Sequence, residues 1–238
     1  MDLLFIDFDG VICDSVNEAY ISSWAARYGL DYPEASIEGK QLFCSYRPFI
    51  KTGSDFMILQ DCVARNVELK KQADFNREHG SLSNEEHRIF NEEFYKARTF
   101  LLENYPDFWY GQNRLYPGVR DVLSKLCKNP NVYILSTKKS AFILKLLARN
   151  GLDWNEERAL YAARSSKIEM IEVLLDKHGC DKAVLLEDQS EYFRDHPNIS
   201  FYLALWGYVA DKDSACAKAD KCLSLDDLEC ELKPWFAI

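Results

Sequence analysis

The sequence predicts an α/β fold: a doubly wound parallel sheet of the Rossmann-like type, with an inserted α-helical domain. From about residue 115 onward, short apolar strands alternate with amphipathic helices, which is typical of βαβ units and a parallel sheet with helices on both faces. An apolar run at residues 3–6 predicts one more buried strand. About a hundred residues with helical patterns follow it, whereas adjacent parallel strands are usually joined by one crossover helix. The helical stretch is therefore interpreted as an insertion.

The predicted elements follow in order along the chain. The inserted region carries helical patterns at residues 17–28, 56–69 and 84–104. The later part is expected to hold helices at 119–126, 140–150 and 166–179 and strands at 132–135, 159–163, 183–186 and 201–205. Pro117 at a first-turn position and Gly151 as a stop residue support these boundaries. We therefore divide the chain into a core of residues 1–13 and 115–238 and an inserted helical domain of residues 14–114.

Composition and charge exclude several classes of protein. The 238 residues carry a formal net charge of −9, which argues against nucleic acid or an anionic membrane as a partner. No apolar run approaches the roughly 20 residues of a membrane span. The N-terminus also lacks the basic stretch and apolar core of a secretory signal. We expect a monomer or homodimer in the cytoplasm, or in a soluble organellar compartment.

Cysteine usage points to the same kind of compartment. The chain has eight cysteines, and none of them forms a C-x-x-C pair, so a zinc site is not expected. Without an export signal, the cysteines are expected to remain reduced thiols that are buried in the protein.

Two carboxylates stand directly after the first predicted strand. Asp7 and Asp9 are two residues apart, so on a strand their side chains point to the same side. They would repel each other unless a cation or a shared proton lies between them. Open α/β sheets bind ligands at such strand ends, and carboxylate oxygens suit Mg²⁺. The segment therefore favours a metal and nucleophile site over an ordinary strand-to-turn junction, where Asp and Gly10 would also be common.

Polar side chains follow three later elements in a similar way. Ser136 and Thr137 end a predicted strand where a helix begins, a place that suits either phosphate binding or a helix cap. Lys167 lies in the first turn of a predicted helix, where the dipole disfavours a cation, so an anionic partner explains it better than solvent does. Glu187 and Asp188 end another apolar strand. They could be ligands of a cation, or Asp188 could be the N-cap of a helix.

Together these four segments resemble the haloacid dehalogenase superfamily of Mg²⁺-dependent phosphoryl-transfer enzymes. The resemblance covers the whole chain and is carried, in the family's order, by Asp7-Phe8-Asp9-Gly10-Val11, Ser136, Lys167 and Glu187-Asp188. The insertion is similar to the family's helical C1-type cap, and residues 116–119 look like its return into the core. Within the superfamily the chain resembles the phosphoglycolate-phosphatase and β-phosphoglucomutase branch. It looks closest to uncharacterised plant and cyanobacterial members, which share Arg47-Pro48, Asn113-Arg114 and Trp206-Gly207-Tyr208.

The resemblance implies a mechanism. Asp7 would attack phosphorus and form an aspartyl-phosphate, while Asp9 would protonate the leaving alcohol and later activate water. Mg²⁺ would be held by acidic residues: the Asp7 carboxylate, the Asp9 backbone carbonyl, Asp188 and, through a water, Glu187. The phosphoryl group would be held by small, hydroxyl and cationic residues: Gly10, Ser136, Thr137 and Lys167.

The inserted domain is expected to select the substrate, a small phosphorylated metabolite. The candidate residues are Arg47, Lys51, Asn113 and Arg114, although each could equally make a structural contact. The acid at Asp9 favours phosphate-ester chemistry over dehalogenation. Ala19 stands where β-phosphoglucomutases carry a His, and this difference argues against mutase activity. Two alternatives stay open: a phosphomutase, and a catalytically silent member that binds a phosphorylated ligand.

Overall fold

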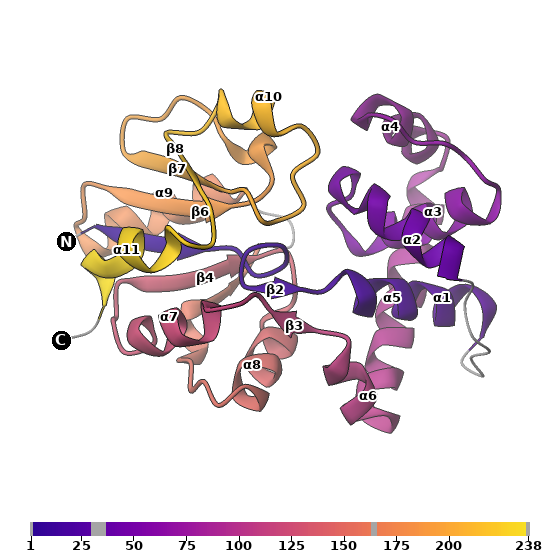
Figure 1. The fold of residues 1–238 in the computed structure, drawn as a ribbon, viewed down its shortest axis with the longest axis horizontal. Coiled ribbons are helices and arrows are strands. Elements are labelled where there is room, and N and C mark those ends of the chain that lie inside the picture. The colour runs from indigo at the N-terminus through magenta and orange to yellow at the C-terminus, as the bar shows by residue number, and fades with distance from the viewer. Residues whose placement is uncertain (1, 30–36, 163–165, 237–238) are drawn as a thin grey trace. The chain divides into compact units, whose positions relative to one another are not determined.

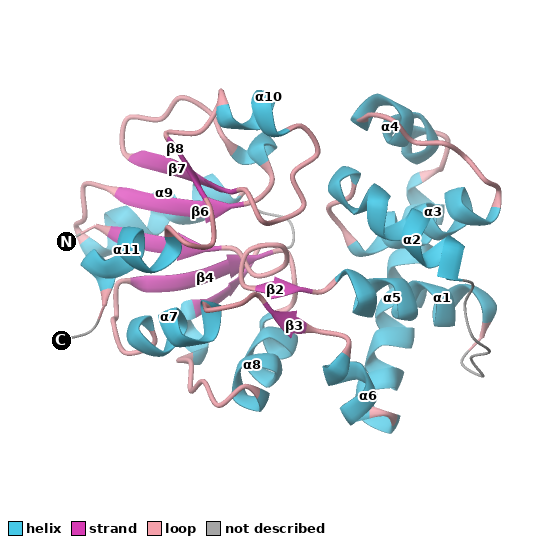
Figure 2. Cartoon of the chain, in the orientation of Figure 1, coloured by secondary structure: helices cyan, strands magenta, loops and turns pink. Residues whose placement is uncertain are grey.

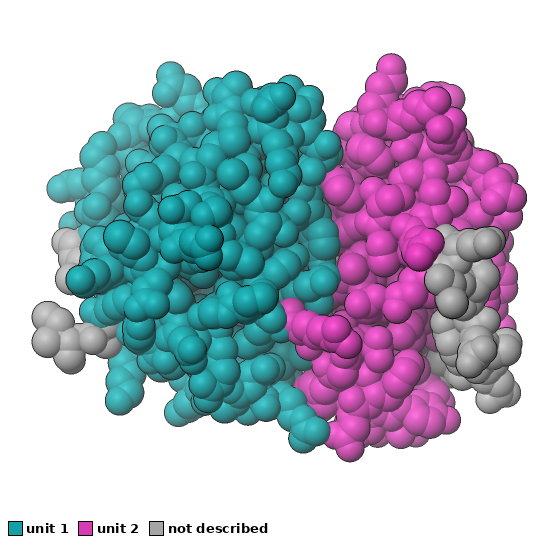
Figure 3. Space-filling model, in the orientation of Figure 1, with its two compact units in different colours: residues 1–14, 115–238 teal, residues 15–114 magenta. Residues whose placement is uncertain are grey.

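The chain folds into two compact units. The computed structural model describes residues 2–29, 37–162 and 166–236. Residues 1–14 and 115–238 form one unit, called here the α/β unit, and residues 15–114 form the other, called the helical unit (Figure 3). Strands and helices are combined in the first, whereas the second is built from helices (Figure 2).

The α/β unit is built on a six-stranded sheet with the strand order β5-β4-β1-β6-β7-β8 (Figure 1). All neighbouring strands in it run parallel, which confirms the predicted fold class. The chain fills one side of β1 with β4 and β5 and then the other side with β6, β7 and β8, so the strand order reverses beside β1. Ligands bind open α/β sheets at such a reversal, at the carboxyl ends of the strands. The strands are β1 (Leu3–Ile6), β4 (Val132–Ser136), β5 (Ala159–Tyr161), β6 (Ala183–Glu187), β7 (Ile199–Ala204) and β8 (Lys221–Leu223).

Apolar residues on both faces of the sheet account for its place in the core. Every residue of β1 is at most 2% exposed, as expected for a strand that is covered on both faces. Ile168, Ile171 and Leu175 of α9 share one apolar cluster with Phe5 and Leu185 of the sheet. Besides three short 3₁₀ turns, the helices of this unit are α7 (Val119–Leu126), α8 (Ser140–Arg149), α9 (Lys167–His178), α10 (Lys212–Cys216) and α11 (Leu228–Leu232). A short two-stranded sheet, β2 (Cys13–Asp14) with β3 (Arg114–Leu115), forms where the chain passes between the units.

The helical unit packs α1, α3 and α5 against one another. Its helices are α1 (Val16–Tyr28), α2 (Ile37–Tyr46), α3 (Gly53–Ala64), α4 (Gln72–Gly80), α5 (Asn84–Asn104) and α6 (Pro106–Gly111), with a 3₁₀ turn at Arg47–Phe49. The helix predicted at 56–69 instead begins at Gly53 and ends at Ala64. Asn66 has a φ of +54°, a left-handed conformation that an α-helix cannot continue. Across the described ranges, we find no helix with the length and apolar character that crossing a membrane requires.

A buried ion pair joins three helices of the helical unit. Nε and Nη2 of Arg98, on α5, donate to the two carboxylate oxygens of Glu18 on α1 at 2.9 and 2.7 Å. Ser22 and the indole N–H of Trp109, on α6, donate to Glu18 at 2.6 and 3.0 Å. Glu18 and Arg98 are 1% and 4% exposed. A carboxylate with this many donors fixes the relative positions of the three helices, because any shift would leave a buried charge without its partner.

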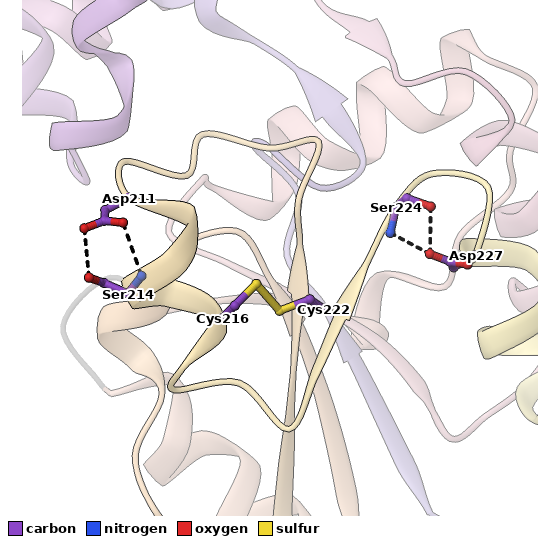
Figure 4. Close-up of a disulfide and its surroundings, with 6 residues drawn as sticks. All are labelled: Asp211, Ser214, Cys216, Cys222, Ser224 and Asp227. Atoms are coloured by element: carbon purple, nitrogen blue, oxygen red, sulfur yellow. Dashed lines mark hydrogen bonds between the residues drawn. A yellow bond between two sulfur atoms is a disulfide. The ribbon is translucent and has the colours of Figure 1, made fainter.

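The cysteines differ from the prediction. Cys216 at the end of α10 and Cys222 in β8 form a disulfide, with Cα atoms 6.0 Å apart (Figure 4). Of the six free cysteines, only Cys13 and Cys62 are buried, and Cys230 is exposed. The prediction of eight reduced, buried thiols was therefore wrong. The physical reason is that the chain turns back after α10, which brings its last residue beside the edge strand β8 (Figure 4).

Arg98→Met is expected to destabilise the protein strongly, because it leaves the buried carboxylate of Glu18 uncompensated. Removing one partner of such a pair costs about 3–5 kcal/mol. The melting temperature of the full chain, measured by circular dichroism, is therefore expected to fall by roughly 10 °C.

Two further variants serve as controls for this prediction. Arg98→Met combined with Glu18→Gln removes both charges and is expected to melt higher than Arg98→Met alone. Arg88→Met removes an exposed arginine of the same helix, which pairs with Glu85 and Glu92, and should change the melting temperature little. Equal melting temperatures for Arg98→Met and Arg88→Met would contradict the importance of the buried pair.

Candidate active site

Three carboxylates of the α/β unit meet at the carboxyl ends of β1 and β6. Asp7 directly follows β1, Glu187 ends β6, and Asp188 follows it. One carboxylate oxygen of each lies within 4.8 Å of those of the other two, and all three residues are buried. The two strands are parallel neighbours, with Ile6 opposite Leu186, so their carboxyl ends share one edge of the sheet. The backbone N–H of Asp7 donates to the carbonyl of Leu186 at 2.9 Å, which continues this pairing past the end of β1.

Lys167 supplies positive charge to this cluster from the first turn of α9. Its ammonium lies 3.0 Å from Asp7 Oδ1 and 2.5 Å from Glu187 Oε2, and the residue is 2% exposed. Burial alone would lower the pKa of Lys167, but the carboxylates of Asp7 and Glu187 outweigh it and raise that pKa above its ordinary value. The side chain is therefore held as an ammonium. Ser166, the N-cap of α9, accepts a hydrogen bond from Ile168 N–H and fixes where the helix begins.

Glu187 is the most deeply buried of the three carboxylates. Its Oε1 accepts hydrogen bonds from the backbone N–H groups of Asp188 and Gln189 at 3.1 and 3.2 Å. Burial raises the pKa of Glu187, the charge of Asp7 raises it further, and Lys167 opposes both, with the result well above the usual range of a glutamate. A divalent cation between these carboxylates would compensate the negative charge that Lys167 leaves.

Two glycines make room for Asp188. A Cβ on Gly10, whose φ is +89°, would lie 2.0 Å from Asp188 Oδ2. A Cβ on Gly207 would lie 2.3 Å from Asp188 Cβ and 2.5 Å from the Gly10 carbonyl. The backbone N–H of Tyr208 donates to Asp188 Oδ2 at 2.6 Å. The loop after β1 and the segment after β7 thus form a close-fitting cradle around this carboxylate.

The three carboxylates fit a hard divalent cation. They offer oxygen donors within 4.8 Å of one another, and oxygen is the donor that Mg²⁺ prefers. Their combined charge exceeds that of Lys167, so the set is anionic. The cradle of Gly10, Gly207 and Tyr208 holds Asp188 in place. Asp7, Asp188 and Glu187 are therefore the residues that would hold Mg²⁺.

Further predicted residues lie at the end of β4, the neighbour of β1 on its other side. Ser136 is the last residue of β4 and is 1% exposed, and Thr137 follows it. Ser136 Oγ accepts a hydrogen bond from the backbone N–H of Lys138 at 3.3 Å. The ammonium of Lys138 lies 3.0 Å from Asp9 Oδ1. The hydroxyls, the second aspartate and the acidic cluster therefore share the carboxyl edge of the sheet.

The residues predicted to select the substrate lie in the helical unit. Arg47 is buried, its Nη1 donates to the carbonyl of Ile50 at 3.0 Å, and its guanidinium lies 5.4 Å from the centre of the Phe56 ring. Asn113 is also buried, and its Nδ2 donates to the carbonyl of Trp109 at 3.0 Å. Both side chains therefore have structural contacts within this unit, whereas Lys51 and Arg114 are exposed.

Sequence reasoning did not select Lys138, Gly207 or Tyr208 as site residues. Lys138 follows two hydroxyl residues at the end of a buried strand, and that position could have indicated a buried lysine in need of a carboxylate. Gly207 and Tyr208 were noted only as part of a resemblance. Their neighbour Trp206 donates its indole N–H to the Val11 carbonyl at 3.0 Å, so this segment also supports the loop after β1.

The fold is a Rossmann-like parallel sheet with three buried carboxylates at its carboxyl edge, and comparison with known proteins agrees with this fold class. No protein-family model matches the chain, and neither does any curated protein. Solved structures do match over nearly all of it. A hydrolase from Pseudomonas syringae matches with a TM-score of 0.64 and 18% identity over 100% of both chains.

Two other solved structures point to one fold family. A predicted phosphoglycolate phosphatase from Haemophilus somnus 129pt matches with a TM-score of 0.61 and 19% identity, covering 98% of this chain and 97% of its own. A haloacid dehalogenase-like family hydrolase from Streptococcus pneumoniae matches with a TM-score of 0.56 and 16% identity over 98% of both chains. The chain therefore shares the fold of haloacid dehalogenase-like hydrolases.

Gly207→Ala is expected to weaken Mg²⁺ binding roughly 10–100-fold, because the added methyl would displace Asp188 or the Gly10 backbone. Isothermal titration calorimetry with Mg²⁺ measures the effect. Gly80→Ala is the matched control, since a Cβ there meets nothing within 4 Å. Unchanged affinity in folded Gly207→Ala would contradict the role of the cradle, and no binding by the unmodified chain would contradict the metal site.

Mg²⁺ binding is also expected to release protons. The pKa of Glu187 is raised, so this carboxyl holds a proton at pH values where an exposed glutamate is ionised, and a bound cation would displace it. Binding should therefore weaken as pH falls. Calorimetry in two buffers of different ionisation enthalpy counts the protons, and Glu187→Gln should remove this release. Equal proton release by both proteins would assign the proton to another group.

Proposed function

We propose that this chain is a Mg²⁺-dependent phosphatase that hydrolyses a small phosphorylated metabolite through an aspartyl-phosphate intermediate. The observation that carries the proposal is the buried cluster of Asp7, Lys167, Glu187 and Asp188 at the carboxyl edge of the sheet. A nucleophilic carboxylate, a fixed cation and an acidic metal site are the groups that phosphoryl transfer requires.

Asp7 is proposed as the nucleophile. One oxygen of its carboxylate forms a bond to phosphorus while the bond from phosphorus to the leaving oxygen breaks. The ammonium of Lys167, 3.0 Å from Asp7 Oδ1, keeps Asp7 oriented and offsets the negative charge that gathers in the transition state. Bound Mg²⁺ would supply further positive charge, which reduces the repulsion between the carboxylate and the phosphate.

Asp9 is proposed as the general acid and base. It gives a proton to the leaving alkoxide oxygen as the aspartyl-phosphate forms. In the second step it takes a proton from water, whose oxygen attacks phosphorus and returns Asp7 to its free carboxylate. Its backbone carbonyl is a further proposed Mg²⁺ ligand. The phosphoryl oxygens are proposed to contact Gly10, Ser136 and Thr137, which lie at or after the ends of β1 and β4, and Lys167, whose ammonium lies beside Asp7.

Hydrolysis is favoured over the alternatives by particular residues. Ala19 argues against the mutase hypothesis, because it is buried in α1 and carries no group that could transfer a proton. A silent, ligand-binding protein would have no need of both Asp7 and Asp9. The helical unit is proposed to select the substrate, and the exposure of Lys51 and Arg114 makes these two the stronger candidates.

Phosphate release tests the proposal directly. The purified protein is expected to release phosphate from p-nitrophenyl phosphate, and from at least one compound in a panel of sugar phosphates, phosphorylated acids and nucleoside monophosphates. Activity should require Mg²⁺ and disappear with a chelator. Asp7→Asn is expected to lower kcat by at least about a thousandfold, because it removes the nucleophile.

Asp2→Asn is the matched control, since it makes the same change at an exposed residue just before β1 and should leave kcat unchanged. Turnover that survives Asp7→Asn would overturn the proposed nucleophile. Sugar-phosphate isomerisation without phosphate release would instead support the mutase.

A further inference from the structure

A second buried lysine lies at the carboxyl edge of the sheet, outside the cluster around Lys167. Lys138 stands between the end of β4 and the beginning of α8. Its side chain is 1% exposed, and its ammonium lies 3.0 Å from Asp9 Oδ1. The ammonium also lies 5.7 Å from the centre of the Phe8 ring, in the same loop as Asp9.

The two partners of this ion pair are unequally buried. The Asp9 side chain is 20% exposed, whereas that of Lys138 is almost completely enclosed. The backbone N–H of Lys138 is bonded to Ser136 Oγ, so the lysine is tied to the strand end at its base as well. The lysine is thus the anchored partner, and the aspartate is the partner that solvent or a substrate reaches.

We infer that Lys138 is a positioning residue that holds the Asp9 carboxyl group in the orientation needed for proton transfer. The inference rests on the proposed phosphatase function and adds a residue to it. A buried ammonium is strongly destabilising unless a carboxylate compensates it. In this site the compensating carboxylate is the proposed general acid, so the pair both satisfies Lys138 and restrains Asp9.

The consequence for the reaction depends on the leaving group. In the first step Asp9 gives its proton to the leaving oxygen while Asp7 bonds to phosphorus. A p-nitrophenolate leaves readily without a proton, whereas a phenolate or alkoxide is more basic and benefits from one. A misplaced Asp9 should therefore slow the departure of basic leaving groups far more than that of p-nitrophenolate.

The experiment measures kcat/KM for a series of substituted phenyl phosphates of nearly equal shape, from p-nitrophenyl phosphate to phenyl phosphate. This parameter reports on the formation of the aspartyl-phosphate and not on its hydrolysis. Lys138→Met is expected to lower kcat/KM for phenyl phosphate roughly 10–100-fold and for p-nitrophenyl phosphate by less than about threefold. Lys139→Met, at the exposed neighbour with the same charge, should match the unmodified protein.

Asp9→Asn is the reference for a lost general acid. Combined with it, Lys138→Met should add no further dependence on the leaving group, because the two residues act through one proton transfer. If Lys138→Met does not fold, Lys138→Gln, which keeps a polar group in the buried position, repeats the test with the same expectation.

The outcomes separate this inference from the proposed function. An equal fall in kcat/KM for all the phenyl phosphates, or no change, would show that Lys138 is merely structural and would overturn the inference. A steeper dependence on the leaving group would support it. Absence of any turnover by the unmodified protein would instead be the failure of the proposed phosphatase.

Discussion

The excess of negative charge at the end of β1 is the constraint on which the rest of the site depends. Asp7, Glu187 and Asp188 are buried within reach of one another, and carboxylates in such a setting repel. Lys167 offsets part of that charge, while burial, and next to it the charge of Asp7, raises the pKa of Glu187. A site that is costly without a cation is well prepared to bind one. Under the proposed function, the local cost in stability is offset when a metal and an anionic substrate bind.

The parallel sheet makes this concentration of charge feasible. β1 lies between β4 and β6, so three strands deliver Asp7, Ser136 and Glu187 to one edge without any long loop. Because β1 is covered on both faces, its end is held by the core, and the side chain that follows has little freedom. Rigid elements of this kind place reactive groups more accurately than loops do.

The features that could be predicted from the sequence are those that a local pattern of residues encodes. Apolar runs gave the parallel sheet, and the rule that parallel strands end at one edge was enough to expect that Asp7, Glu187 and Asp188 meet. Close contacts that depend on how loops and turns run could not be predicted. Nothing near Gly207 in the sequence reveals that Asp188 fills the space beside it, and the pairing of Cys216 with Cys222 depends on how the chain turns after α10. The end of α3 could not be predicted either, because a non-glycine residue, Asn66, adopts the left-handed conformation just after it.

Two buried lysines pair with two different aspartates: Lys167 with Asp7, and Lys138 with Asp9. Asp7, the proposed nucleophile, is buried beside Lys167 within the cluster of three carboxylates, a setting that suits a group that must be an anion and held still. Asp9, the proposed general acid, must exchange protons with its surroundings, and it keeps a fifth of its side chain exposed while Lys138 pairs with one of its oxygens. The residues lie two apart on one loop and share a strand end, yet each has its own cation from a different element, α9 for Asp7 and the β4–α8 junction for Asp9. The different roles proposed for these two similar carboxylates thus rest on the different neighbours that the fold gives them.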